Sequence, residues 1–152
     1  MILGAVNDSI DKLLFAGHMI MFVVAFAPAV INPVLFAKAK GDGDEGALVR
    51  LAGHLASNGR QIHFPALIAM GGFGIAMVLT SDDQFGFGDT WVSLAFLVWL
   101  GICGVVSGML LPGERRLGAG DLSAEKLVER GGQLATLLLL VMLYLMIWKP
   151  GA

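Results

Sequence analysis

Charged side chains are scarce in this chain of 152 residues: 14% are Asp, Glu, Lys or Arg, whereas 57% are hydrophobic. A typical soluble domain carries about 25% charged residues, so the composition excludes an ordinary water-soluble enzyme or binding domain. The mean hydropathy of +0.79 indicates the same class. The sequence therefore predicts an integral membrane protein.

Cysteine and the motifs of soluble enzymes are also lacking. Cys103 is the single cysteine, which excludes an intramolecular disulfide. The chain contains no phosphate-binding loop, no basic patch for nucleic acid and no constellation typical of a soluble enzyme. These absences exclude nucleic acid as a partner, and the lipid bilayer is the first partner that we expect.

The chain contains four long runs without Asp, Glu, Lys or Arg. They cover residues 13–37, 63–80, 91–111 and 134–148. Because a helix crosses a bilayer with about 20 apolar residues, each run is long enough, or nearly so, to form one span. We expect an all-α fold with a single domain over residues 1–152, an integral membrane four-helix bundle. Its spans are predicted at about 13–37, 61–80, 91–111 and 131–149.

The basic residues are distributed unevenly among the loops. Most lie between the first and second runs or between the third and fourth: Lys38, Lys40, Arg50, Arg60, Arg115, Arg116, Lys126 and Arg130. The loop between the second and third runs carries Asp82, Asp83 and Asp89 but no basic residue. By the positive-inside bias, both termini face outward and the basic loops face the cytoplasm. We expect a multi-pass protein of the cell inner (cytoplasmic) membrane.

The first basic loop has a helical pattern of its own. Its apolar residues recur with helical spacing: Ala47, Leu48, Leu51, Ala52 and Leu55. The pattern predicts a short amphipathic helix in the first cytoplasmic loop, which either lies along the inner interface or extends the second span. In the second basic loop, Pro112 and Gly113 are expected to end the third span.

Polar and small side chains form one stripe on each span and are expected to face the bundle interior. The stripes predict an outer layer of His18, Met77, Ser93 and Tyr144 and an inner layer of Asn32, His63, Ser107 and Gln133. His18 and His63 are expected to lie on the order of 20 Å apart along the membrane normal, from the helical rise. One metal ion in one protomer is therefore not expected to bind both. The Gly104-to-Gly108 spacing also favours a close approach of two helices.

His18 is the most informative residue because it is ionisable and lies in an uncharged span, where such groups usually serve function. A haem or copper site with His18 as the metal ligand is one hypothesis, since imidazole suits both metals. Ser93, Met77 and Tyr144 lie at a compatible depth and are the candidate partners in cofactor binding. The equally weighted alternative is a neutral imidazole bonded to a serine, a tyrosine or a carbonyl that a proline frees.

In the inner layer, His63, Asn32 and Gln133 are secondary candidates for a site. A position of His63 near the lipid headgroups is favoured over a second metal site. A proton relay through these three residues is conceivable, but no carboxylate is expected within the spans to support it.

Segments from all four spans carry a resemblance to a known superfamily. They read "LLFAGHMIMFVVAFAPAVINPVLFAKA", "GRQIHFPALIAMGGFGIAMVL", "WVSLAFLVWLGICG" and "ATLLLLVMLYLMIWKPGA". Together they resemble the small membrane proteins that include the CopD-type copper-resistance domain and the HemJ-type protoporphyrinogen oxidases, with the closest fit to uncharacterised members. The resemblance implies a four-helix bundle and, for HemJ-like proteins, b-type haem bound by the histidine that corresponds to His18.

The chain departs from the HemJ-like pattern at two places. HemJ-like proteins carry a lysine early in span 3, and residues 91–96 here contain none. Their span 4 opens with an Asn-Glu-x-Pro-Thr-like segment, of which residues 132–136 keep only Thr136. The resemblance thus implies a haem or metal site without the partners for porphyrinogen oxidation.

Three functional hypotheses share this fold. The first is binding of haem b through His18 for electron transfer or redox sensing, in a homodimer or a larger membrane complex and with an oxidoreductase activity left open. The second is copper binding or transport through His18 and methionines. The third is a cofactor-free accessory subunit of a larger membrane complex.

Overall fold

The computed structural model describes residues 9–81 and 85–151, and the described part of the chain contains helices and no strand. The first half forms α1 (Ser9–Gly41), α2 (Glu45–Asn58), the π turn η1 (Gly59–His63) and α3 (Phe64–Leu79). The second half forms α4 (Thr90–Val105), the π turn η2 (Val106–Leu110), α5 (Leu111–Gly118), η3 (Leu122–Ala124) and α6 (Glu125–Trp148). Asp82 and Asp83 of the predicted outer loop lie outside the described residues.

Four continuous helical stretches of the described residues are long and apolar enough to cross a membrane. The predicted all-helical fold is confirmed, and the four stretches are consistent with a multi-pass membrane protein. They cover Ile10–Gly41, Glu45–Leu79, Thr90–Gly118 and Leu122–Trp148. All four extend beyond the uncharged runs, because the helices continue through polar residues at one or both ends. In particular, α2 continues without a break through η1 into α3.

Two π turns connect helical segments, and each is followed by a proline. The N–H of Phe64 donates to the carbonyl of Gly59 at the end of η1, and the N–H of Leu111 donates to Val106 at the end of η2. Pro112 does not end the helix, because α5 continues to Gly118. Proline is tolerated in the first turn of a helix, and the π turn before it takes up the change in hydrogen bonding.

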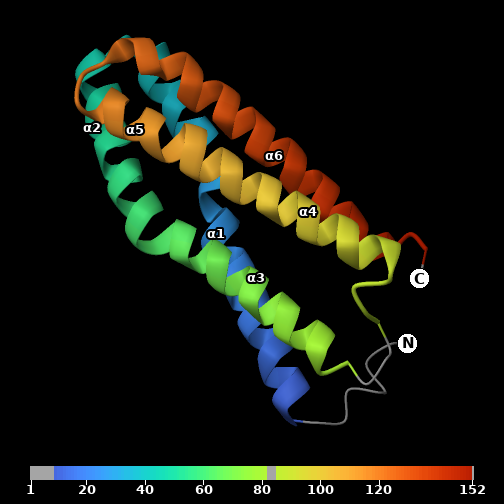
Figure 1. Ribbon diagram of the computed structural model, residues 1–152. Coiled ribbons are helices and arrows are strands. Elements are labelled where there is room, and N and C mark those ends of the chain that lie inside the picture. Colours follow the sequence, from blue (N-terminus) through green and yellow to red (C-terminus); the bar gives the residue numbers. More distant parts are fainter. Residues whose placement is uncertain (1–8, 82–84, 152) are drawn as a thin grey trace.

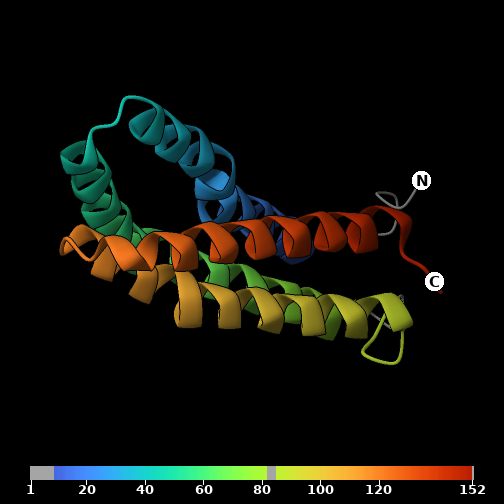
Figure 2. The same cartoon turned by 90° about the horizontal axis from the view of Figure 1, so that it is seen from above.

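The helices pack as two pairs, which contact each other through a shared buried cluster and, at one end of the molecule, through α2 and α5. Helix α1 packs along α3, α4 packs along α6, and α2 packs against α5 (Figures 1 and 2). One buried cluster draws on all four spans: Phe26, Leu67, Met70, Ala95, Ile102, Leu139, Met142 and Leu145. A second cluster joins α2, α5, η3 and α6: Leu48, Ala52, Leu117, Ala124 and Val128. The second cluster holds the two pairs together at the α2–α5 end.

Glycine permits the closest contact at this end. A Cβ atom on Gly118 would lie 2.6 Å from the Cα atom of Gly53, which is too close for any side chain. The expected close approach at Gly104 and Gly108 is wrong, because a Cβ atom on either would have no neighbour within 4 Å. The close helix contact is therefore made by α2 and α5 and not by the glycines of the third apolar run.

We predict that Gly118→Ala destabilises the protein by about 1–3 kcal/mol, because its methyl group would collide with backbone that cannot rotate away. The matched control is Gly104→Ala, which enters open space and is expected to stabilise the helix by about 0.5–1 kcal/mol. Unfolding of the detergent-solubilised proteins by SDS measures both effects. Equal stability of the two variants would contradict the close α2–α5 contact.

Candidate functional site

His18 lies on α1, and its ring is held by a bond to the neighbouring helix. Its Nδ1 atom lies 2.9 Å from the carbonyl oxygen of Met70 on α3. Since a carbonyl oxygen only accepts, Nδ1–H donates, and Nε2 is left with its lone pair. Gly74 makes room for the ring, because a Cβ atom there would lie 3.4 Å from Cε1. His18 is therefore a half-buried imidazole with one fixed and one available nitrogen.

His63 makes a similar bond in the opposite direction, from η1 to α1. Its Nδ1 atom lies 2.7 Å from the carbonyl oxygen of Val24. That carbonyl lies four residues before Pro28, which has no N–H to donate to it. The imidazole of His63 thus replaces the missing helical hydrogen bond. This geometry gives His63 a structural role.

The two histidines are closer than the sequence predicts. His63 contacts α1 at Val24, six residues after His18, which corresponds to about 9 Å along the helix axis. The expected separation of roughly 20 Å is therefore wrong. The prediction placed His63 at the inner end of the second span. In the structure, α2 and most of η1 precede His63 in one continuous helical stretch, so His63 lies well inside that stretch.

Tyr144 and Ser93 of the predicted outer layer form contacts elsewhere, and Met77 lies on the helix that His18 contacts. Tyr144 is 51% exposed and its ring stacks on Trp148 at a centroid distance of 5.3 Å. The hydroxyl of Ser93 donates to the carbonyl of Phe87 at 2.6 Å. Met77 lies on α3, the helix that His18 contacts, one turn beyond Gly74. No group of three or more His, Cys, Asp or Glu side chains suited to a metal occurs among residues 9–81 and 85–151.

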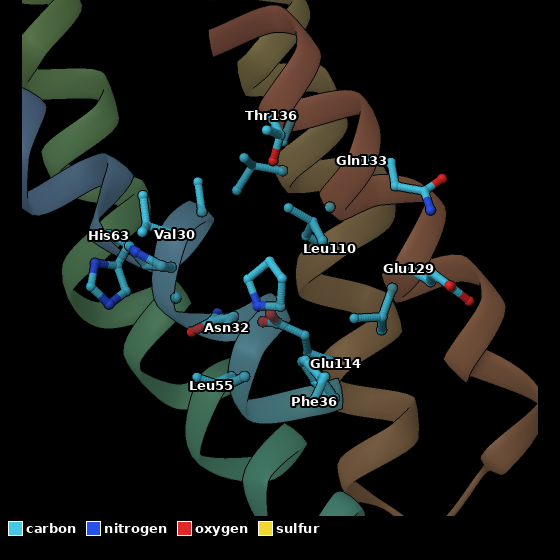
Figure 3. A pocket seen from close by; sticks show the side chains of 18 of the residues that line it. Val30, Asn32, Phe36, Leu55, His63, Leu110, Glu114, Glu129, Gln133 and Thr136 are labelled. Carbon is cyan, nitrogen blue, oxygen red and sulfur yellow. The ribbon is translucent and has the colours of Figure 1, made fainter. Parts of the chain in front are cut away.

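Three of the four inner-layer residues do come together, around a cavity of about 930 Å³. Asn32 from α1, His63 from η1 and Gln133 from α6 all line it (Figure 3). Ser107 does not, since its hydroxyl donates to the carbonyl of Cys103 within its own helical stretch. The walls are mainly apolar and include Phe26, Phe36, Leu67, Ile102, Leu110 and Leu140.

Glu114 is the residue of this cavity that sequence reasoning missed. Among the described residues it is the one charged side chain that is buried, with 6% exposure. Its carboxyl group points from α5 into the cavity, toward the side on which Asn32 lies (Figure 3). The carboxyl group lies on α5, past the predicted end of the third span at residue 111, where the sequence predicts a loop. Leu110, Glu114 and Leu117 are spaced so that they share one face of a helix. This spacing could have indicated that Glu114 is buried, but the interpretation of Pro112 as the end of the helix excluded it.

Two of the charged side chains that line the cavity, Lys40 and Glu125, form an ion pair. The Nζ atom of Lys40 lies 2.6 Å from Oε1 of Glu125. Beyond the cavity, Arg116 lies 2.7 Å from Asp121, and the hydroxyl of Ser123 together with this guanidinium lowers the pKa of Asp121. Glu114, by contrast, forms no hydrogen bond or ion pair within the described part of the chain. Removing a carboxyl group from water without a partner is costly, and the open position for a partner of Glu114 is on the side of the cavity.

Comparisons with known proteins find no relative of this chain. No family model, no curated protein and no solved structure matches the chain. The resemblance to CopD-type and HemJ-type proteins therefore stays a prediction. The function has to be inferred from the two sites themselves.

We predict that His63→Ala destabilises the protein by about 1–3 kcal/mol, because it leaves the Val24 carbonyl without a donor. In a Pro28→Ala background the cost should fall by at least about half, because the N–H of the new alanine can bond to Val24. SDS unfolding of the wild type, both single variants and the double variant measures this coupling. An equal cost of His63→Ala in both backgrounds would contradict the role assigned to His63.

Proposed function

We propose that the chain is an inner-membrane protein that binds b-type haem through His18 and serves electron transfer or redox sensing. In this proposal both termini face outward and α2 lies on the cytoplasmic side, as an amphipathic extension of the second span. The observation that carries the proposal is the bond from His18 Nδ1 to the carbonyl of Met70. Histidines that bind metals commonly anchor one ring nitrogen in this way and present the other.

The hydrogen bonds of His18 and His63 differ in whether the carbonyl that accepts them has a helical N–H donor of its own. Val24 requires a donor because Pro28 cannot supply one. Met70 has no such need, because residue 74 is a glycine with its own N–H inside α3. The bond from His18 is therefore not required to repair the helix, and its effect is to fix the orientation of the imidazole. This difference favours His18 over His63 as the haem ligand.

The residues around His18 fit a haem in part. The ring is fixed and Nε2 is available, but the described residues bring no second histidine beside it. Only 6% of the most apolar stretch of α1 is buried inside the protein, the smallest share of the four spans. A second copy of the chain has room to approach α1 and to supply its own His18, which supports a homodimer. When bound, haem supplies the one-electron chemistry, and the protein supplies the ligand and an apolar surrounding.

Copper is the second candidate because of one observation. Met77 lies one turn beyond the glycine that contacts His18, and thioether and imidazole both suit cuprous copper. A copper site would use this methionine, because no group of three or more His, Cys, Asp or Glu side chains suited to a metal occurs in residues 9–81 and 85–151.

Oxidised and reduced visible spectra of the purified protein, with a metal analysis, test the proposal. We expect a Soret band in the wild type that is lost in His18→Ala. His54→Ala is the matched control, since His54 is exposed on α2, and it should keep the band.

A folded His18→Ala protein that retains full haem would contradict the proposal. Copper without a Soret band would favour the second candidate. A purified protein with neither haem nor copper would favour the third hypothesis, a cofactor-free accessory subunit of a larger membrane complex.

A further inference from the structure

The cavity between the helix pairs has the size and walls of a small-molecule site. Its volume of about 930 Å³ lies in the range of about 300–1,000 Å³ that is usual for ligand pockets. Apolar side chains form most of its surface, and the rings of Phe26 and Phe36 are among them. Such walls suit an apolar molecule, and aromatic faces also attract cations. His18 does not line this cavity, so it is separate from the proposed haem site.

The charges of the cavity indicate the sign of its ligand. Lys40 is the one basic residue among the lining side chains besides His63, against Glu114, Glu125 and Glu129. Lys40 is already paired with Glu125, and the Nδ1 atom of His63 is bonded to Val24. Glu114 is nine-tenths buried, faces the cavity and has no partner in the described part of the chain. The missing partner of a buried carboxylate is a positive charge.

We propose that this cavity binds a lipophilic organic cation, with the carboxylate of Glu114 as the counter-charge. The apolar walls contact the body of the ligand, and the carboxylate offsets the cost of removing its charge from water. An anion of the same shape would meet Glu114 and Glu129 with no free basic side chain to balance it. The ligand class follows from the pairing of one unpartnered carboxylate with a large apolar volume.

Gly59 and Gly132 both border the cavity, but only Gly132 leaves room for a side chain, because a Cβ atom on Gly59 would lie 2.8 Å from Cδ2 of Leu111. A Cβ atom on Gly59 would lie 3.5 Å from Oε2 of Glu114, so the π turn η1 passes close to the carboxyl group. Gly132 lines the cavity from α6, and a Cβ atom there would have no neighbour within 4 Å. A side chain at Gly132 therefore begins in open space at the wall of the cavity.

Equilibrium dialysis of the detergent-solubilised full chain with tetraphenylphosphonium tests the proposal. We expect saturable binding to the wild type and a loss of affinity of at least tenfold in Glu114→Gln, which keeps the shape of the side chain but removes its charge. Glu45→Gln is the matched control, because Glu45 is an exposed carboxylate on α2 outside the cavity. It should bind as the wild type does.

A second pair of variants keeps Glu114 and changes the volume. Gly132→Phe should abolish binding by filling the cavity, whereas Gly72→Phe, which also enters open space but on α3 outside the cavity, should not. Tetraphenylborate, an anion of the same shape, should show no saturable binding that depends on Glu114.

The proposal is overturned if the wild type shows no saturable binding of tetraphenylphosphonium, or if Glu114→Gln binds it as the wild type does. It is also overturned if Gly132→Phe leaves binding unchanged, or if both ions bind equally well. The Soret band gives a separate readout, because loss of cation binding in Glu114→Gln should leave haem at His18 unaffected.

Discussion

The hydrogen bond from His63 to the carbonyl of Val24 is the interaction on which the rest of the structure depends. In apolar surroundings each backbone polar group has to find its partner within the protein, and Pro28 leaves the Val24 carbonyl without its helical donor. His63 supplies that donor from the π turn before α3, so the repair also binds α1 to α3. The bond from His18 to Met70 holds the same pair at a second level. With α1 and α3 held together in this way, the open volume lies between the two helix pairs.

The contact of the two pairs at one end then defines the cavity. Gly53 and Gly118 let α2 and α5 approach closely, and the ion pair of Lys40 and Glu125 connects the end of α1 to the start of α6. Between these contacts and the four-helix core lies the volume into which Glu114 points (Figure 3). The chain thus separates two kinds of chemistry. A fixed imidazole with a free nitrogen lies between α1 and α3, and a carboxylate without a partner lies between the helix pairs.

Much of the architecture could be predicted, because four uncharged runs in a bilayer have few alternatives to four helices. The polar stripes assigned Asn32, His63 and Gln133 to one layer, and all three line the cavity, although the predicted depth of His63 relative to His18 was wrong. Glu114 could not be placed while Pro112 was interpreted as the end of a helix, since a π turn leaves no simple mark in the sequence. The role of His63 depended on a contact with Val24, 39 residues away, and no local pattern encodes that contact. At Gly104 a local pattern was present but the contact was not. The spacing of Gly104 and Gly108 matches a helix-packing motif, yet a Cβ atom at Gly104 would have no neighbour within 4 Å.

The central claim is that Glu114 is an unpaired carboxyl group in an apolar cavity that accepts a cation. Labelling with dicyclohexylcarbodiimide, an apolar reagent for carboxyl groups, followed by peptide mass spectrometry, tests it most directly. The account predicts that the label is found on Glu114 and that tetraphenylphosphonium prevents its attachment there, while labelling of exposed carboxyl groups is unchanged. Labelling that spares Glu114, or that proceeds there equally with and without the cation, would contradict it.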